Sequence, residues 1–76
     1  MPAIKPVGSQ TLAKLFEQDG FTLNRRRGDD LIYTKPEIKR PLVIPTYNAV
    51  PLFIIKNRLR TAGMTRERYF SLLEKL

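Results

Sequence analysis

The sequence contains no cysteine and no histidine, and these two absences restrict its chemistry more than any residue that is present. Without cysteine there are no disulfides and no thiolate nucleophile, which fits a reducing compartment. With both residues missing, a structural zinc site and any Cys–His or Ser–His–Asp mechanism are excluded. We therefore expect neither a bound metal nor a cofactor.

Long apolar runs are missing as well. No stretch approaches the roughly 20 apolar residues of a membrane-spanning helix, and residues 1–10 lack the apolar segment of a signal peptide. We expect a cytoplasmic protein with no membrane partner. The 76 residues leave room for one domain. We expect an extended lead-in over residues 1–8, where proline and glycine are frequent, and a single domain over residues 9–76.

Positive charge is abundant and unevenly distributed. The chain has 14 Lys and Arg against 7 Asp and Glu, a net charge of +7, and the whole excess lies in residues 25–76. Clustered arginine in a basic domain is typical of proteins that bind phosphate groups. The pattern favours nucleic acid or an acidic protein as the partner, and the alternative is a basic surface that serves only solubility.

Three stretches show the spacing of apolar residues that is typical of helices. We expect them over residues 9–19, after residue 50 and after residue 65. Their apolar positions are Leu12, Leu15 and Phe16; Leu52, Ile55, Leu59 and Ala62; and Tyr69, Leu72, Leu73 and Leu76. The residues expected at their ends are the N-cap Ser9 and the closing Gly20, the first-turn Pro51 and the closing Gly63, and the N-cap Thr65.

Between the first and second helices the pattern changes to short strands. These are expected at residues 21–24, 31–35 and 42–44, separated by turns at 25–30 and 36–40. Such short connections favour an antiparallel meander, with the first two helices covering its apolar face. The predicted fold class is α+β: an α-β-β-β-α sandwich like that of double-stranded-RNA-binding domains, with a third C-terminal helix.

Five short motifs occur in a fixed order between Ser9 and Phe70. They are Gly20-Phe21, Arg27-Gly28, Leu31-Ile32-Tyr33, Val43-Ile44-Pro45 and Leu59-Arg60-Thr61-Ala62-Gly63. Together they resemble the HicA, or YcfA-like, toxins of bacterial HicA–HicB toxin–antitoxin systems. The resemblance implies an mRNA-cleaving endoribonuclease, RNA as its target and a HicB-like antitoxin protein as its partner.

The chain departs from that family at the start of the second strand. The family usually has Gly-Ser-His there, with histidine as the catalytic residue, whereas this sequence has Gly28-Asp29-Asp30. Imidazole, with a pKa of about 6.5, suits removal of the 2′-OH proton near neutral pH. An exposed aspartate, with an ordinary pKa of about 3.9, is a poor base and repels the scissile phosphate. We therefore take Asp30 as the residue at the catalytic position and expect impaired cleavage.

The candidate RNA-binding residues fall into two groups. One leads into the first turn, and the other forms a basic ridge four residues apart on the second helix, where related folds approach phosphates. They are Arg25, Arg26, Arg27 and Gly28, and then Lys56 and Arg60. The alternative for each group is an ordinary solvated surface. Lys39 and Arg40 belong to the other turn, which a meander places at the opposite end of the sheet.

Two other functions stay open. The chain could be a non-catalytic protein-interaction module that kept the fold and uses Phe53 and Ile54 to bind a protein or to form a homodimer. It could also be a DNA-binding regulator, although no helix has the pattern of a recognition helix. Tyr33 and Tyr47 could stack on bases, and the alternative for both is a half-buried position in the sheet.

Overall fold

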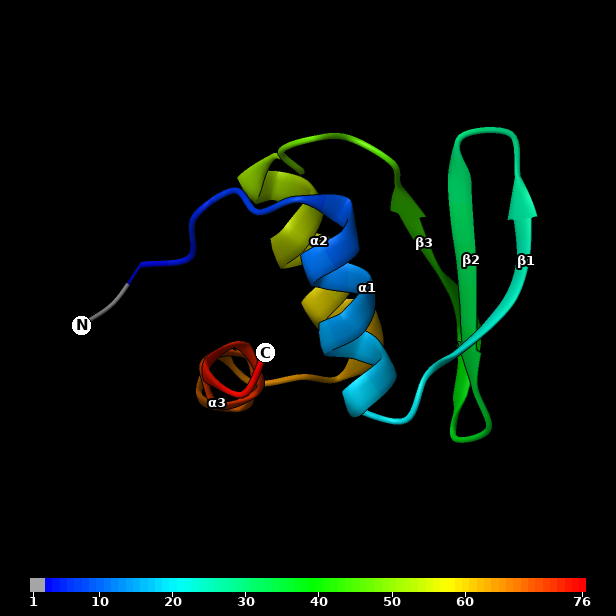
Figure 1. Cartoon of the computed structure of the whole chain (residues 1–76). Coiled ribbons are helices and arrows are strands. Elements are labelled where there is room, and N and C mark those ends of the chain that lie inside the picture. Colours follow the sequence, from blue (N-terminus) through cyan, green and yellow to red (C-terminus); the bar gives the residue numbers. More distant parts are fainter. Residues whose placement is uncertain (1–2) are drawn as a thin grey trace.

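The computed structural model, which describes residues 3–76, has a helix, three strands and two more helices in chain order (Figure 1). This order confirms the predicted α+β class and its third C-terminal helix. The elements are α1 (Ser9–Gln18), β1 (Thr22–Arg27), β2 (Asp30–Lys35), β3 (Ile38–Pro45), α2 (Leu52–Ala62) and α3 (Arg66–Glu74).

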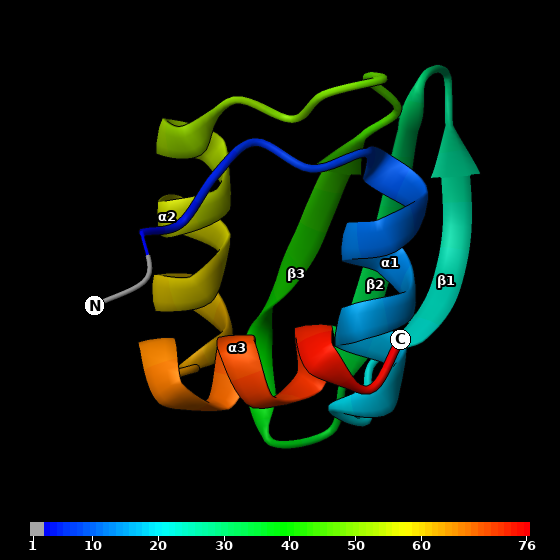
Figure 2. The ribbon, with the colours of Figure 1, turned by 60° about the vertical axis from the view of Figure 1, so that its left-hand side comes forward.

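The molecule consists of one sheet and one layer of helices. The three strands are antiparallel in the order β1-β2-β3, so the two hairpin turns lie at opposite ends of the sheet, as predicted. Helices α1 and α2 lie side by side over one face, and α3 crosses near their ends (Figure 2). No helix or strand of residues 3–76 covers the other face (Figure 1).

The core lies between the sheet and the helices. Its largest fully buried side chains are Tyr33, Tyr69, Phe16, Phe21, Leu12, Leu15, Leu42, Ile44, Ile55 and Val50. Two residues expected on the apolar helix faces lie outside it: Leu52 is 36% exposed and Leu76 is 47% exposed. Both lie at helix ends: Leu52 is the first residue of α2, and Leu76 lies beyond the last residue of α3.

The two ends of α1 explain its length. Gly8, not Ser9, is the N-cap, and it offers no side-chain acceptor. At the other end Gly20 adopts a φ of 101°, as its predicted closing role requires. The Phe21 N–H donates to the Phe16 carbonyl at 3.0 Å, and the two rings meet edge to face at 5.7 Å between centroids. This paired backbone and ring contact stops the helix and turns the chain into β1.

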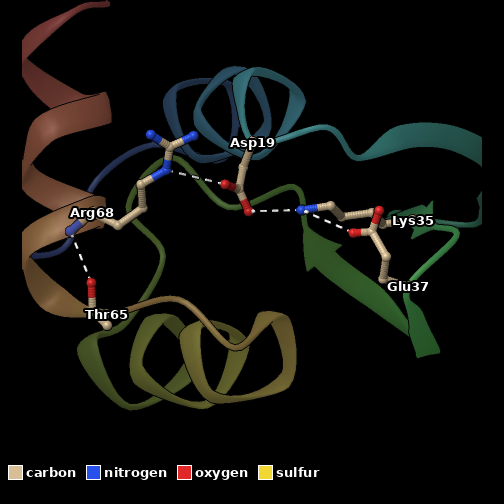
Figure 3. Close-up of polar contacts among 5 residues, drawn as sticks. All are labelled: Asp19, Lys35, Glu37, Thr65 and Arg68. Atoms are coloured by element: carbon tan, nitrogen blue, oxygen red, sulfur yellow. Dashed lines mark hydrogen bonds and ion pairs between the residues drawn. The ribbon is translucent and has the colours of Figure 1, made fainter.

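Helices α2 and α3 end nearly where the sequence predicts. Pro51 is the N-cap of α2 rather than its first helical residue, and Gly63 closes the helix in the left-handed conformation. The Thr65 hydroxyl accepts the Arg68 N–H at 3.1 Å, which confirms the predicted cap of α3 (Figure 3). Arg68 also reaches Asp19 at the end of α1, with 3.2 Å between its Nε and an Asp19 oxygen.

The strands are longer than the sequence predicts, and the turns are correspondingly shorter. Residues 25–27 belong to β1 and residues 38–41 belong to β3, which leaves only residues 28–29 and 36–37 in the turns. The predicted turns at 25–30 and 36–40 are therefore wrong in extent. Charged side chains hide the strand pattern, but pairing with β2 satisfies the backbone of these residues regardless of their side chains.

The segment before α1 packs against the domain. Ile4 is 6% exposed and belongs to the core, and the Val50 N–H donates to the Val7 carbonyl at 2.7 Å in an isolated bridge. Residues 1–2 of the predicted lead-in lie outside the described residues. The bridge fixes the start of α1 against the chain that enters α2.

Candidate nucleic-acid interface

The candidate site is the sheet face that turns away from the helices. Directly paired residues of an antiparallel ladder share one face of the sheet. Arg25 is paired with Ile32, Arg27 with Asp30, and Ile32 with Val43 on the other side. Ile32 lies outside the core cluster, so this set faces away from α1 and α2. We call it the open face.

The open face carries a hollow of about 560 Å³. It is lined by Arg27, Gly28, Asp29, Asp30, Ile32, Val43 and Tyr47. Its floor is apolar because the nearly buried side chain of Ile32, which is 9% exposed, lines it. Tyr47 at its border is 52% exposed. An apolar floor with polar groups and an exposed ring at its border suits a flat base with charged groups around it.

The β1–β2 turn is held rigidly at this hollow. Gly28 has a φ of 59°, which a two-residue hairpin with glycine in first position requires. The Asp29 carbonyl accepts both the N–H and the hydroxyl of Thr46, at 2.9 and 2.7 Å. Thr46 follows β3 directly, so the turn at one sheet end is tied to the exit of the third strand. Sequence reasoning missed this contact.

The three consecutive arginines do not share a face. Asn24 has no register partner, which makes it an extra residue between Leu23 and Arg25 in the ladder with β2. Arg26 is then paired with Leu31, which packs against the core, so Arg26 lies on the helix-covered side. Arg25 and Arg27 remain on the open face, and within residues 3–76 their guanidinium groups have no hydrogen-bond or ion-pair partner.

Arg58 reaches the same region from α2. Its Nε donates to the Val43 carbonyl, and its Nη1 donates to the Asn57 side chain at 2.6 Å. Burial lowers the pKa of Arg58, and the carboxylate of Asp30 opposes that shift. Arg58 is not among the candidate residues taken from the sequence, because nothing in the sequence shows that α2 packs along β3.

Lys56 and Arg60 lie elsewhere. Each is two residues from Arg58, which places it about 160° around the helix from the side that meets β3. Both are exposed, on the side of α2 that turns away from the open face. The structure therefore brings Arg25, Arg27 and Gly28 together around Asp30, and it does not bring Arg26, Lys56 or Arg60 to them. Lys39 and Arg40 lie at the opposite sheet end, as predicted.

Asp30 is half-buried at the start of β2, between Arg27 on one neighbouring strand and Pro45 on the other. With Arg58 also nearby, its carboxylate stands among cations. Residues 3–76 contain no group of three or more acidic side chains that could hold a metal ion. Chemically, the carboxylate can accept a hydrogen bond and can orient an arginine, and it repels a phosphate placed directly on it.

The two tyrosines proposed for base stacking differ in position. Tyr33 points into the core with 2% exposure, and its hydroxyl donates to Glu17 at 2.6 Å. Burial and that bond raise the pKa of Tyr33 to about 12. It is therefore a structural residue and cannot stack on a base. Tyr47 follows β3 and keeps its ring available to the open face.

Residues 9–64, about three quarters of the chain, match the family described as HicA toxin of bacterial toxin-antitoxin. The chain belongs to the HicA toxin family. This HicA protein is thus the toxin module of a toxin–antitoxin pair, and an antitoxin is its implied partner. A search of curated proteins finds no match to it. Within residues 3–76, no helix has the length and apolar character to cross a bilayer.

Proposed function

We propose that this HicA protein is a cytoplasmic toxin module that binds RNA on its open face, cleaves it poorly, and is neutralised by a HicB-like antitoxin. The observation that supports RNA binding is the pair Arg25 and Arg27. They lie next to each other on a face that no element of residues 3–76 covers, and neither guanidinium forms an ion pair with a described residue. Guanidinium groups without partners bind phosphate oxygens in pairs of hydrogen bonds.

The turn beside these arginines favours close approach of a strand of RNA. A Cβ built on Gly28 meets nothing within 4 Å, so the backbone at this point is open to solvent. Arg26, Lys56 and Arg60 lie on other faces, and they add to the long-range attraction of a polyanion rather than to the same contact. A bound strand would run along the Arg25–Arg27 side of the hollow, because Asp29 and Asp30 repel phosphate at its centre.

The proposal of poor cleavage depends on Asp30. The resemblance to HicA toxins implies a histidine at this position, and the chain offers none anywhere. A carboxylate is not protonated near neutral pH in the way that an imidazole is, so it cannot serve in turn as base and acid for the 2′-OH reaction. Binding without efficient cleavage is the expected result.

Salt-dependent RNA binding tests the binding proposal. Filter binding of a structured RNA should weaken steeply with added salt, and the Arg25→Ala/Arg27→Ala variant should reduce the log–log slope by about 1.4, or about 0.7 for each lost phosphate contact. The matched control is Lys39→Ala/Arg40→Ala, which removes the same charge at the other sheet end and should leave the slope nearly unchanged. If no structured RNA is retained at low ionic strength, the proposal is wrong.

Cleavage is tested at Asp30. Purified Asp30→His protein should cleave RNA faster than the unmodified protein, since it restores a group that titrates near neutral pH. Its expression should also arrest growth more strongly. If instead the unmodified protein arrests growth and Asp30→Ala abolishes that arrest, Asp30 is catalytic in its own right and the proposal of impairment is wrong.

A protein-interaction role is the second candidate function. It is favoured by Phe53, a large apolar side chain on α2 that is 73% exposed and could contact a protein partner. In that case the fold serves a protein partner or a homodimer. Sedimentation at several concentrations separates the candidates, because a strict monomer that binds RNA and no protein excludes this one.

A further inference from the structure

The outer edge of β1 is an open edge of the sheet. β1 pairs with β2 on one side, and no element of residues 3–76 lies beyond it on the other (Figure 2). All six residues of β1 are exposed. An edge strand presents backbone N–H and C=O groups without partners, and another strand can bind to them.

The ladder shows which backbone groups of β1 point outward. The Val43 carbonyl accepts a hydrogen bond from Arg58 of α2, so Val43 turns its backbone groups away from β2. Its register partner Ile32 therefore directs its own N–H and C=O toward Arg25 of β1. Because these directions alternate along a strand, the N–H and C=O of Arg26 point to the outer edge.

The same alternation applies to the next residue of β2. Tyr33 directs its backbone groups toward β3, so its register partner Leu23 directs its own groups to the outer edge. Within residues 3–76, the N–H groups of Leu23 and Arg26 donate to nothing outside the sheet. Both residues therefore offer a donor and an acceptor to a strand that lies beside β1.

The opposite edge of the sheet is closed to a further strand. Pro41 and Pro45 of β3 have no N–H to donate, and Arg58 already occupies the Val43 carbonyl. Helix α2 also packs against this strand. A strand from another molecule can therefore extend the sheet beside β1 but not beside β3.

The side chains of β1 specify the charge of such a strand. Arg25 and Arg27 lie on the open face and Arg26 on the other, and β1 contains no acidic residue. A strand paired with β1 directs successive side chains to both faces, so acidic residues on it meet all three arginines. A nucleic-acid strand on the open face meets only two of them. A second copy of β1 is repelled, because like charges would face each other across the pair.

We propose that β1 binds an extended acidic segment of a protein partner, which adds to the sheet as a fourth strand. The backbone of the segment bonds to Leu23 and Arg26, and its carboxylates pair with the arginines. Leu23, which is 51% exposed, adds an apolar contact. The inference rests on the protein partner of the proposed function and not on its RNA binding.

Amide hydrogen exchange tests the backbone contact. The probe is a short synthetic peptide, blocked at both ends, with the sequence Thr-Glu-Glu-Glu-Thr-Val-Thr, and the control peptide has glutamine in place of each glutamate. An excess of the glutamate peptide should slow the exchange of the Leu23 and Arg26 amides, and the glutamine peptide should slow it much less. If the glutamate peptide protects neither amide, or if both peptides protect them equally, the inference is wrong.

Two variants at Leu23 separate the backbone from the side chain. Leu23→Pro removes the outward N–H, which an edge strand tolerates, and Leu23→Ala keeps the N–H while it shortens the side chain. Leu23→Pro should bind the glutamate peptide about three- to tenfold more weakly than Leu23→Ala does. Equal binding would mean that the peptide contacts side chains alone, which overturns the inference. Circular dichroism checks that Leu23→Pro folds, and if it does not, the exchange experiment on the unmodified protein decides.

RNA binding and oligomeric state separate the other occupants of this edge. Leu23→Pro keeps every arginine, so it should bind RNA as the unmodified protein does. If it loses RNA as strongly as it loses the peptide, the edge is an RNA contact and the assignment to a protein is overturned. If sedimentation shows a dimer that Leu23→Pro dissociates, the occupant is a second copy of this chain. If the peptide fails to bind while Arg25→Ala/Arg27→Ala still loses RNA, the inference alone is wrong and the proposed RNA binding stands.

Discussion

Tyr33 shows at the scale of one residue how a polar group is placed in the core. Its hydroxyl lies on the helix-covered side of the sheet and donates to Glu17 of α1, and this bond links the sheet to the helix layer. Because the pKa of Tyr33 is raised to about 12, folding favours its neutral form. The raised pKa contributes stability that is complete below the ordinary value of 10 and is lost as the pH rises toward 12.

We predict that Tyr33→Phe lowers the free energy of unfolding by about 1–3 kcal/mol at pH 7, because Glu17 loses its donor. Between pH 9 and pH 11 the variant should lose less stability than the unmodified protein, since one of the tyrosines with a raised pKa is gone. Urea unfolding followed by circular dichroism at several pH values measures both effects. Burial also raises the pKa of Tyr69, so part of the alkaline loss remains in the variant.

The matched control is Tyr47→Phe. The exposed Tyr47 hydroxyl should contribute little to stability, so this variant should follow the unmodified protein across the pH range. A Tyr33→Phe variant with the same alkaline loss as the unmodified protein would contradict the assignment of that loss to Tyr33.

Some residues of the candidate site could be proposed from the sequence, and others could not. Asp30 and its arginine neighbours could be proposed from the sequence because the order of the motifs places them at one turn. Arg58 and Thr46 were missed, since each acts on a strand or turn more than ten positions away. A contact of that kind depends on which elements pack together, and the sequence alone does not show the packing.

At the scale of elements, one carboxylate links α3 to the rest of the molecule, in addition to the core packing of Tyr69 and Leu72. Asp19 at the end of α1 lies 3.6 Å from Lys35 Nζ and 3.2 Å from Arg68 Nε (Figure 3). The Asp19 side chain is 12% exposed, so it is well shielded from solvent. Lys35 belongs to β2 and Arg68 to α3, and Asp19 therefore joins the two layers and the crossing helix.

We predict that Asp19→Asn lowers the free energy of unfolding by about 1–2 kcal/mol, because two cations lose a shielded counter-charge. Glu37 also pairs with Lys35, at 3.7 Å, but its side chain is 74% exposed. Glu37→Gln should therefore cost less than about 0.5 kcal/mol. Urea unfolding measures both, and hydrogen exchange should show faster exchange in α3 for Asp19→Asn alone. Equal effects of the two variants would contradict a shielded network.

The order of the elements and the residues that end or cap the helices could be predicted from the sequence, but the length of the strands could not. Gly20, Gly63 and Thr65 act where their backbone freedom or hydroxyl predicts. Residues 25–27 were predicted as a turn because three arginines show no alternation, yet they pair along β2. The sequence therefore located the candidate residues along the chain, but it did not show that Arg26 lies on the other face from Arg25 and Arg27. The extra residue at Asn24 is visible only once the two strands are paired.

At the scale of the whole molecule, the two layers divide the roles of the two sheet faces. Helices α1 and α2 cover one face and build the core (Figure 2). The opposite face has no helix over it in residues 3–76, and it carries the hollow with Arg25 and Arg27 beside it. The molecule carries a net charge of +7 and is small, with a Cα radius of gyration of 11.4 Å. Repulsion among the cations therefore opposes folding at low salt.

We predict that salt affects stability and RNA binding in opposite directions. Raising sodium chloride from about 20 to 300 mM should screen the repulsion and stabilise the fold by about 1 kcal/mol, or roughly 4–8 °C in Tm. The same change should weaken RNA binding. Thermal unfolding followed by circular dichroism measures the first effect. A Tm that falls with salt would mean that ion pairs such as Asp19–Arg68 outweigh the repulsion.

The unpaired Asn24 gives β1 one residue more than its ladder with β2 requires. Phe21 is anchored in the core on one side of it, and the Gly28 turn is anchored on the other. Loss of Asn24 alone would remove the bulge and keep the pairs Arg25–Ile32, Arg26–Leu31 and Arg27–Asp30, so Arg25 and Arg27 would stay on the open face. Evolution could therefore shorten β1 by this one residue without re-aiming an arginine, because the residue lost holds no place in the ladder.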